Sequence, residues 1–349
     1  MPSGRFVELS LSAQTAYAEL SEQTRSFELT SALAGLVGSF QRMARGHRSY
    51  WYFAYRDLDQ RVRMIYVGPD DPRVRTLVER FDRIRVARQL APQAAATLAL
   101  GCTTVAPKHF RIVKRLADYG FFRAGGILIG THAFLALGNV LGVRWTDGAA
   151  TLDVDFAHAG RNISVALPAN IEIDAHDALE SLEMGLLPLN QLDGGAGGHY
   201  RNPADPELRI DFVTSAGRSR KPVHIANLNL ALQPLKFMEL SLEATTQGCL
   251  VGRAGACTVN LPTPERYAVH KLLVFAERPT SERAKATKDL LQAASLASFL
   301  VDAGQASTFN EIWREVLERG KGWRDRARRG RAALLRIAPE LDNDSLWRS

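Results

Sequence analysis

The chain has 349 residues, of which 46% are hydrophobic, and this is enough to bury more than one hydrophobic core. Its three cysteines, Cys102, Cys249 and Cys257, lack metal-binding spacing and are too few to staple a secreted fold, so a reducing cytoplasm is expected. No apolar signal region is found at the N-terminus, and a net charge of +7 favours an anionic partner.

The first hundred residues combine helical patterns with an aromatic hairpin. Residues 7–45 carry apolar side chains at helical spacing, and residues 73–100 return to that pattern. Residues 49–67 predict a β-hairpin with its turn at Asp57–Gln60. The hairpin either packs on neighbouring helices or grips an acceptor nucleic acid by stacking and phosphate contacts. The side chains that would serve the second role are Tyr50, Trp51, Tyr55, Arg56, Arg61 and Arg63.

An apolar, glycine-containing segment follows at residues 121–142. Ile127–Ile129 predicts a short buried strand, Gly130 and Thr131 a tight turn, and residues 132–140 a helix. Backbone N–H groups at a helix start, together with the threonine hydroxyl, form an anion site suited to the phosphates of a nucleotide. The glycines and polar residues favour this β-turn-α unit over a membrane span.

Two aspartates, Asp153 and Asp155, lie in the strand-like run at residues 150–157. Side chains at positions i and i+2 of a strand point the same way, roughly 6.5–7 Å apart at Cα. Two carboxylates that share a face repel each other unless a cation lies between them, so the pair indicates a divalent metal site. The alternative is a solvated edge strand.

A third carboxylate, Asp211, lies in the middle of a second predicted strand at residues 208–213. If this strand pairs beside the first, three carboxylates converge, as a hard ion such as Mg²⁺ or Mn²⁺ requires. The glycine-rich stretch Gly194–His199 just before it predicts a mobile loop or a tolerated insertion, and nothing fixes a role for His199 or Tyr200.

The order Gly130-Thr131, Asp153-x-Asp155 and Asp211 resembles the DNA polymerase β-like nucleotidyltransferase superfamily over about residues 105–215. The resemblance implies catalysis and metal binding by the three aspartates, with an NTP, ATP among the candidates, as co-substrate. One departure is the long gap between Thr131 and Asp153, to which residues 143–148 add a strand end and a turn.

The downstream segment from Leu261 to Leu291 is similar to bacterial abortive-infection-type and uncharacterised nucleotidyltransferases. That similarity implies that Lys271 contacts triphosphate oxygens, and that Lys288 and Asp289 hold the helix and nucleotide in register. Lysine is apt as a point charge on phosphate. The alternative for Lys271 is an ordinary surface lysine on an amphipathic helix.

The C-terminal region predicts helices at residues 284–300 and 309–318 and a basic cluster at Arg319–Arg331. The cluster either follows phosphates, with Trp323 stacking on a base, or forms a solvated helix with Trp313 and Trp323 packed on the core. The cations considered for RNA binding are Arg326, Arg328, Arg329 and Arg331.

These observations predict an α+β fold: an N-terminal helical region with an aromatic β-hairpin (1–104), a nucleotidyltransferase core with a mixed sheet (105–260) and a C-terminal helical domain (261–349). The expected activity is metal-dependent transfer of an NMP from an NTP to an acceptor hydroxyl in a cytoplasmic, bacterial enzyme. The acceptor stays open between RNA, such as a tRNA end modified by a toxin- or defence-like enzyme, an aminoglycoside-type small molecule and a protein. A non-catalytic nucleic-acid-binding module is a further alternative, and the oligomeric state stays open.

Overall fold

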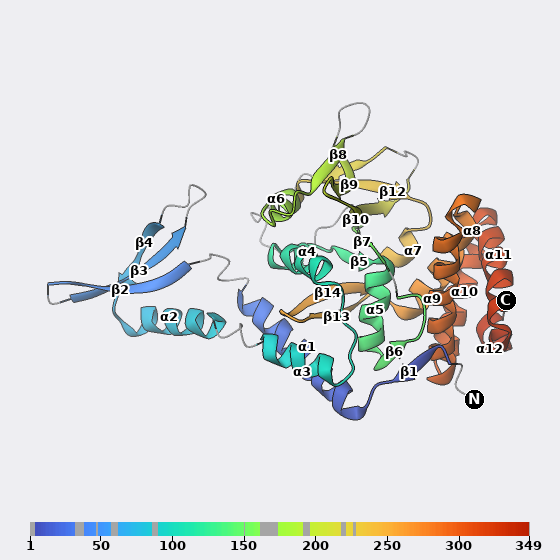
Figure 1. Cartoon of the computed structure of the whole chain (residues 1–349), viewed down its shortest axis with the longest axis horizontal. Coiled ribbons are helices and arrows are strands. Elements are labelled where there is room, and N and C mark those ends of the chain that lie inside the picture. The colour runs from blue at the N-terminus through green and yellow to red at the C-terminus, as the bar shows by residue number, and fades with distance from the viewer. Residues whose placement is uncertain are drawn as a thin grey trace.

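The computed structural model describes residues 4–31, 38–46, 48–56, 62–85, 90–149, 151–160, 174–190, 196–217, 221–225 and 228–348. These form the predicted α+β fold, with a mixed central sheet and a helical C-terminal region (Figure 1). A small sheet formed by residues 38–69 stands apart at the left of that view, and the helices that follow residue 263 gather at the right. No described helix is long and apolar enough to span a lipid bilayer.

The central sheet has seven strands, and β11, β12, β10, β7 and β5 lie side by side in that order. Strands β7 and β10 are parallel neighbours, while β5 runs antiparallel to β7. The strands are β5 (Ile127–Ile129), β7 (Asp153–Ala157), β8 (Leu187–Asn190), β9 (Ala196–Asn202), β10 (Asp205–Ser215), β11 (Val223–Ile225) and β12 (Leu230–Leu235). The strands predicted at residues 127–129 and 208–213 are confirmed, and the one predicted at residues 150–157 is confirmed over residues 153–157.

The prediction of a loop at Gly194–His199 is wrong for residues 196–199, which belong to β9 and pair with β10 and β8. A Cβ at Gly198 would lie 2.5 Å from the carbonyl oxygen of Phe212 and 3.0 Å from that of Ala231. Glycine therefore serves the close approach of three strands here, rather than flexibility.

The two faces of the sheet differ sharply because side chains alternate along each strand. Val154 and Phe156 of β7 are fully buried, and Phe156 stacks on its cross-strand partner Phe212 with ring centroids 5.2 Å apart. Because these side chains face the core, Asp153 and Asp155 of β7 and Asp211 of β10 lie on the opposite face of the sheet.

The remaining core elements hold this sheet between helices. Helix α4 (Pro107–Asp118) begins with a proline, and α5 (Gly130–Val140) is buried from Thr131 to Asn139. Trp145 stacks on Phe134 of α5 at 4.7 Å and donates its indole N–H to the Phe134 carbonyl. The other elements are α6 (Ala175–Glu180), α7 (Glu239–Leu242), β1 (Phe6–Glu8), β6 (Val143–Trp145), β13 (Thr245–Gly252) and β14 (Gly255–Pro262).

The C-terminal helices share one hydrophobic core with the sheet, from Val105 to Trp347. Helix α11 packs closely on α8, because a Cβ at Gly330 would lie 2.5 Å from the Leu272 carbonyl oxygen. The helices predicted at residues 284–300 and 309–318 are confirmed. The bounds are α8 (Pro264–Glu277), α9 (Arg283–Asp302), α10 (Ala306–Glu318), α11 (Lys321–Ile337) and α12 (Asp344–Trp347), with 3-10 turns at Thr280–Glu282 and Pro339–Leu341.

The N-terminal region contains three helices and a three-stranded antiparallel sheet. The predicted hairpin is confirmed, although its turn at Asp57–Gln60 lies outside the described residues. The helical prediction for residues 7–45 is wrong over residues 7–8, which belong to β1 and pair with β6, and over residues 38–45, which pair with the aromatic strand as a third strand. The helical prediction for residues 73–100 is confirmed over residues 73–85 and 90–99, and residues 86–89 lie outside the described part of the chain. The bounds are α1 (Leu11–Ser31), β2 (Gly38–Arg45), β3 (Arg48–Arg56), β4 (Val62–Pro69), α2 (Pro72–Arg85) and α3 (Leu90–Ala99).

Helices α1 and α3 pack against the β13–β14 hairpin of the core. The Tyr17 hydroxyl accepts a hydrogen bond from the backbone N–H of Cys249 and donates one to its carbonyl, at 2.9 and 3.1 Å. The domain boundaries at residues 104 and 260 stay predictions.

Candidate active site

Two of the predicted carboxylates are direct neighbours across the sheet. Asp155 of β7 is the register partner of Asp211 of β10, and Asp153 is the partner of Arg209. Asp153, Asp155 and Asp211 all lie on the face opposite the phenylalanine layer. Burial, followed by repulsion from Asp211 and Asp153, raises the pKa of Asp155 to about 6. The strands thus concentrate negative charge at one place on the sheet.

Gly130 closes against this acidic centre. It has a φ of +63°, and a Cβ at this position would lie only 2.0 Å from Oδ2 of Asp155. Its carbonyl oxygen accepts a hydrogen bond of 2.7 Å from the Tyr267 hydroxyl of α8. Only glycine satisfies both the left-handed backbone and the close approach, so the turn and the carboxylate form one unit.

Thr131 has a buried side chain that is 2% exposed. Its Oγ1 accepts a hydrogen bond of 3.3 Å from the Gln292 amide of α9, which also donates to the Gly148 carbonyl. The hydroxyl is thereby engaged within the protein. The first turn of α5 has no side-chain cap, so its N–H groups can receive an anion.

Asp153 and Asp211 each contact a side chain that sequence reasoning left without a role. Nζ of Lys285 lies 3.3 Å from Oδ2 of Asp153. Nδ1 of His199 lies 2.7 Å from Oδ1 of Asp211, its register partner, and this hydrogen bond raises the pKa of the imidazole. A signal for His199 exists in the sequence only once its stretch is assigned to a strand.

The donor chemistry of this face fits a hard divalent cation. The three carboxylates lie on one face of two paired strands, and burial, followed by repulsion from Asp211 and Asp153, raises the pKa of Asp155. Within the described residues, no group of three His, Cys, Asp or Glu side chains is arranged to hold a metal ion. Joint coordination by the three aspartates would require Asp153 and Asp211 to turn from Lys285 and His199.

Lys271, Asp289 and Arg278 form a buried ionic cluster beside the acidic centre. Nζ of Lys271, which is 7% exposed, lies 2.8 Å from Oδ1 of Asp289, and Arg278 binds the other oxygen. Burial alone would raise the pKa of Asp289, but Lys271 and Arg278 lower it. The reverse holds for Lys271, whose pKa Asp289 raises against the effect of burial. Lys271 is therefore a charged, fixed residue that links α8 to α9, not an ordinary surface lysine.

A cavity of about 830 Å³ opens beside Asp153, between α4, α5, β7, β10 and the start of α9. Its cationic lining comes from Lys285, Lys288 and Arg209, and its apolar lining includes Leu135 and Leu152. Burial first, and Lys271 second, lower the pKa of Lys288. A cleft with cations at one carboxylate-bearing wall and apolar side chains elsewhere suits a nucleotide.

Two buried histidines, His109 and His132, also line this cavity. Nε2 of His132 lies 3.1 Å from Nδ1 of His109. Burial, followed by the neighbouring His109 and Lys288, lowers the pKa of His132 to about 3, so its ring is neutral. No local sequence pattern links these two histidines, because they lie 23 residues apart in the chain.

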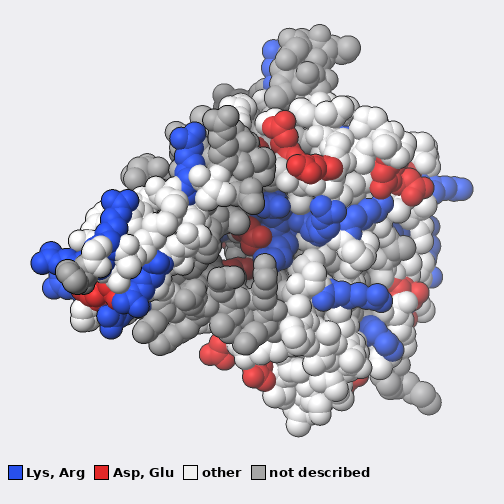
Figure 2. Space-filling view, turned by 60° about the vertical axis from the view of Figure 1, so that its left-hand side comes forward, with Lys and Arg blue, Asp and Glu red and all other residues white. Residues whose placement is uncertain are grey.

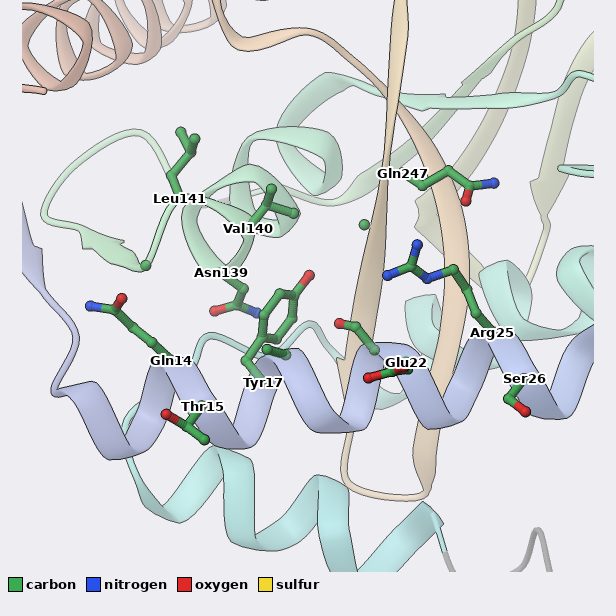
Figure 3. Close-up of a pocket in the computed structure, with 14 residues that line it drawn as sticks. Gln14, Thr15, Tyr17, Glu22, Arg25, Ser26, Asn139, Val140, Leu141 and Gln247 are labelled. Carbon is green, nitrogen blue, oxygen red and sulfur yellow. The ribbon is translucent and has the colours of Figure 1, made fainter. Parts of the chain in front are cut away.

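A second cavity, of about 950 Å³, lies between α1, the end of α5 and β13 (Figure 3). It is at the opposite end of α5 from Gly130. Two of its buried polar residues have structural partners: Tyr17 bonds to Cys249, and Asn139 bonds to the backbone of Thr103 through both amide atoms. This cavity therefore belongs to the packing of α1 on the core.

The basic cluster at Arg319–Arg331 is largely engaged within the protein. Arg319 pairs with Glu243 and Glu315, Arg326 with Glu277, and Arg331 with Asp342. Trp313 is buried, and Trp323 packs edge-on against Phe237. These contacts favour the interpretation of a packed, solvated helix, with Arg328 and Arg329 exposed.

A family model described as nucleotidyltransferase matches residues 108–318, more than half of the chain. The chain belongs to the nucleotidyltransferase family. It is therefore an enzyme that transfers phosphorus-containing groups, with an NTP as substrate. The match spans every predicted site residue from Gly130 to Asp289. Comparison with curated proteins and with solved structures gave no significant match.

Proposed function

We propose that this nucleotidyltransferase is metal-dependent and that Asp153, Asp155 and Asp211 are its catalytic carboxylates. The observation that carries the proposal is the cross-strand pair of Asp155 and Asp211, with Asp153 on the same face. Lys285 contacts Asp153, and the charges of Lys271 and Lys288 act on Asp155. The earlier resemblance to the DNA polymerase β-like superfamily supports the same three residues.

The three aspartates would hold Mg²⁺ or Mn²⁺, which supplies charge neutralisation for the phosphates and a site for the attacking oxygen. The first turn of α5, which begins at Gly130 and Thr131, would bind terminal phosphate oxygens through backbone N–H groups. Lys271, Lys285 and Lys288 would add positive charge along the triphosphate. Asp289 would act indirectly by holding Lys271.

In the proposed reaction, an acceptor hydroxyl oxygen attacks the α-phosphorus in line. A new O–P bond forms, the bond from the α-phosphorus to the bridging oxygen breaks, and pyrophosphate leaves. Asp211 would receive the hydroxyl proton after turning from His199, which its carboxylate contacts in the structure. Most of the rate enhancement would come from positioning and electrostatics, as in other phosphoryl-transfer enzymes.

The acceptor decides the biological role. An RNA acceptor such as a tRNA end, a small molecule of the aminoglycoside type and a protein hydroxyl are all consistent with the site. A non-catalytic binding module is disfavoured, because all three carboxylates are present and face the same way.

The test is incubation of the full chain with NTPs labelled at the α-phosphate, Mg²⁺ or Mn²⁺, and separate RNA, protein and small-molecule fractions. We expect label to enter one fraction only, to require the metal and to be lost in Asp155→Asn. Absence of transfer to all three fractions, under conditions where the chain binds NTP, would favour the non-catalytic module.

A further inference from the structure

The three-stranded sheet β2–β4 has two unlike faces. One face is covered from the side of α2: Nε1 of Trp51 donates to Oδ1 of Asp70 at 2.9 Å, and a Cβ at Gly68 would lie 2.9 Å from Val74 of α2. Phe53, which packs on Phe40 of β2, is only 6% exposed. This face therefore carries the buried ring of Phe53, although its cross-strand partner Ile65 is 48% exposed.

The other face carries three tyrosines, Tyr50, Tyr52 and Tyr66, which we call the aromatic face. Tyr52 and Tyr66 are cross-strand partners with ring centroids 5.6 Å apart, and Tyr50 lies 6.1 Å from Tyr66. Tyr66 is 54% exposed. Among the residues predicted to stack, Tyr50 belongs to this face, but Trp51 points to the opposite one. The side chains of Tyr55 and Arg56, and all of Arg61, lie outside the described residues.

The same face ends in two arginines. Arg45 and Arg48 are direct cross-strand partners at the tip of the β2–β3 hairpin, and Arg45 lies 5.9 Å above the ring of Tyr52. Like charges placed opposite each other destabilise a sheet. No described side chain of this face is acidic, and Lys and Arg side chains gather over this lobe (Figure 2). The pair therefore places two exposed positive charges at the end of the aromatic face.

We propose that the aromatic face, together with Arg45 and Arg48, binds a single-stranded nucleic acid. Bases would stack on the tyrosine rings, and phosphates would meet the arginines, since exposed aromatic rings with interleaved cations recognise single strands. A duplex hides its bases and would lose the stacking term. A role of the bound strand as acceptor of the nucleotidyl group rests on the proposed function. Binding of the strand to the aromatic face does not depend on it.

The test is fluorescence anisotropy with the full chain and a labelled oligouridine of about 12 nucleotides. Tyr52→Leu with Tyr66→Leu removes the rings, whereas Tyr52→Phe with Tyr66→Phe keeps them. We expect the leucine variant to bind at least about tenfold more weakly and the phenylalanine variant to stay within about twofold of wild type. Arg45→Gln with Arg48→Gln should reduce the slope of log K against log salt by up to about 1.4.

The control is Arg328→Gln with Arg329→Gln on α11, which removes the same charge and should leave the slope unchanged. An oligothymidine of the same length distinguishes DNA from RNA, and preferential binding of either strand supports the proposal. Equal binding by the leucine and phenylalanine variants, equal affinity for a duplex, or loss of slope only in the α11 control would overturn it. NTP binding, measured separately in the same variants, should not change, which distinguishes this proposal from the nucleotidyl-transfer site. If the leucine variant fails to fold, the arginine variant and the duplex comparison still decide.

Discussion

The α-carbon of Gly130 lies directly against the carboxylate of Asp155, leaving no room for a side chain between them. The helix start that would receive phosphates and the strand that carries the acidic centre are therefore fixed relative to each other. The register of β7 with β10 then adds Asp211 to the same place. This arrangement has consequences for mutation that separate packing from catalysis.

Gly130→Ala should abolish nucleotidyl transfer and destabilise the protein by more than the roughly 1–2 kcal/mol of backbone strain alone. The matched control is Gly304→Ala, because Gly304 also has a positive φ, of +71°, but a Cβ there meets nothing within 4 Å. Thermal unfolding should show a loss of stability from backbone strain in both variants. Label transfer should be lost only in Gly130→Ala. Equal behaviour of the two would remove the special role of the Gly130 contact.

Thr131→Val should lower stability by about 1 kcal/mol, because the buried hydrogen bond from Gln292 is lost. If the hydroxyl contacts phosphate, as the sequence pattern predicts, its loss would raise KM for NTP. Because the hydroxyl is buried and bonded to Gln292, we expect KM to stay within about twofold of wild type. Steady-state kinetics on Thr131→Val and Gln292→Leu distinguish the two. A large rise in KM for Thr131→Val alone would restore the hydroxyl as a phosphate ligand.

Asp289→Asn should destabilise the fold by about 3–5 kcal/mol, since it leaves the buried Lys271 ammonium without its counter-charge. Lys271→Met combined with Asp289→Asn should recover part of that loss. Denaturant unfolding of the two single variants and the double variant measures the coupling. Additive effects would show that the pair is not a coupled unit.

Lowering the pH should reduce the free energy of unfolding, in part because of His132. The pKa of His132 in the folded state is about 3, below the ordinary value of 6.5. Because the unfolded chain then binds the proton more readily, stability is full above about pH 6.5 and falls as the pH drops toward 3. The variant His132→Gln can still bond to His109. When the pH falls from about 7 to about 5, its free energy of unfolding should decrease by about 2 kcal/mol less than that of wild type. Parallel pH profiles of unfolding would contradict this.

Much of the fold was predictable because the spacing of apolar residues in the sequence matches the side chains that are buried in the structure. Ile127–Ile129, Asp153–Ala157 and the helices after residue 284 have clear apolar spacing, and the structure confirms them. Residues 38–45 were mispredicted as helix, since their strand character comes from pairing with β3. Gly198 was mistaken for a loop residue because its close approach to Phe212 is a tertiary requirement.

The carboxylates of the candidate site were predictable from the sequence, but the side chains that contact them were not. Alternation along a strand indicates that Asp153 and Asp155 share a face, whichever strand lies next to them. Lys285 and His199 reach that face only through the packing of α9 and the register of β9. Such long-range contacts leave no local pattern in the sequence.

The most direct test of the account is label transfer from an α-labelled NTP by Asp155→Asn and Asp211→Asn, beside Asp302→Asn as a control on an exposed part of α9. We predict loss of transfer by at least about a hundredfold in both site variants, with the control unchanged. Removal of the charge repulsion should leave the thermal midpoint of Asp155→Asn, measured without divalent metal, at or above that of wild type. Transfer at the wild-type rate by folded Asp155→Asn and Asp211→Asn would contradict the assignment of this face as the catalytic centre.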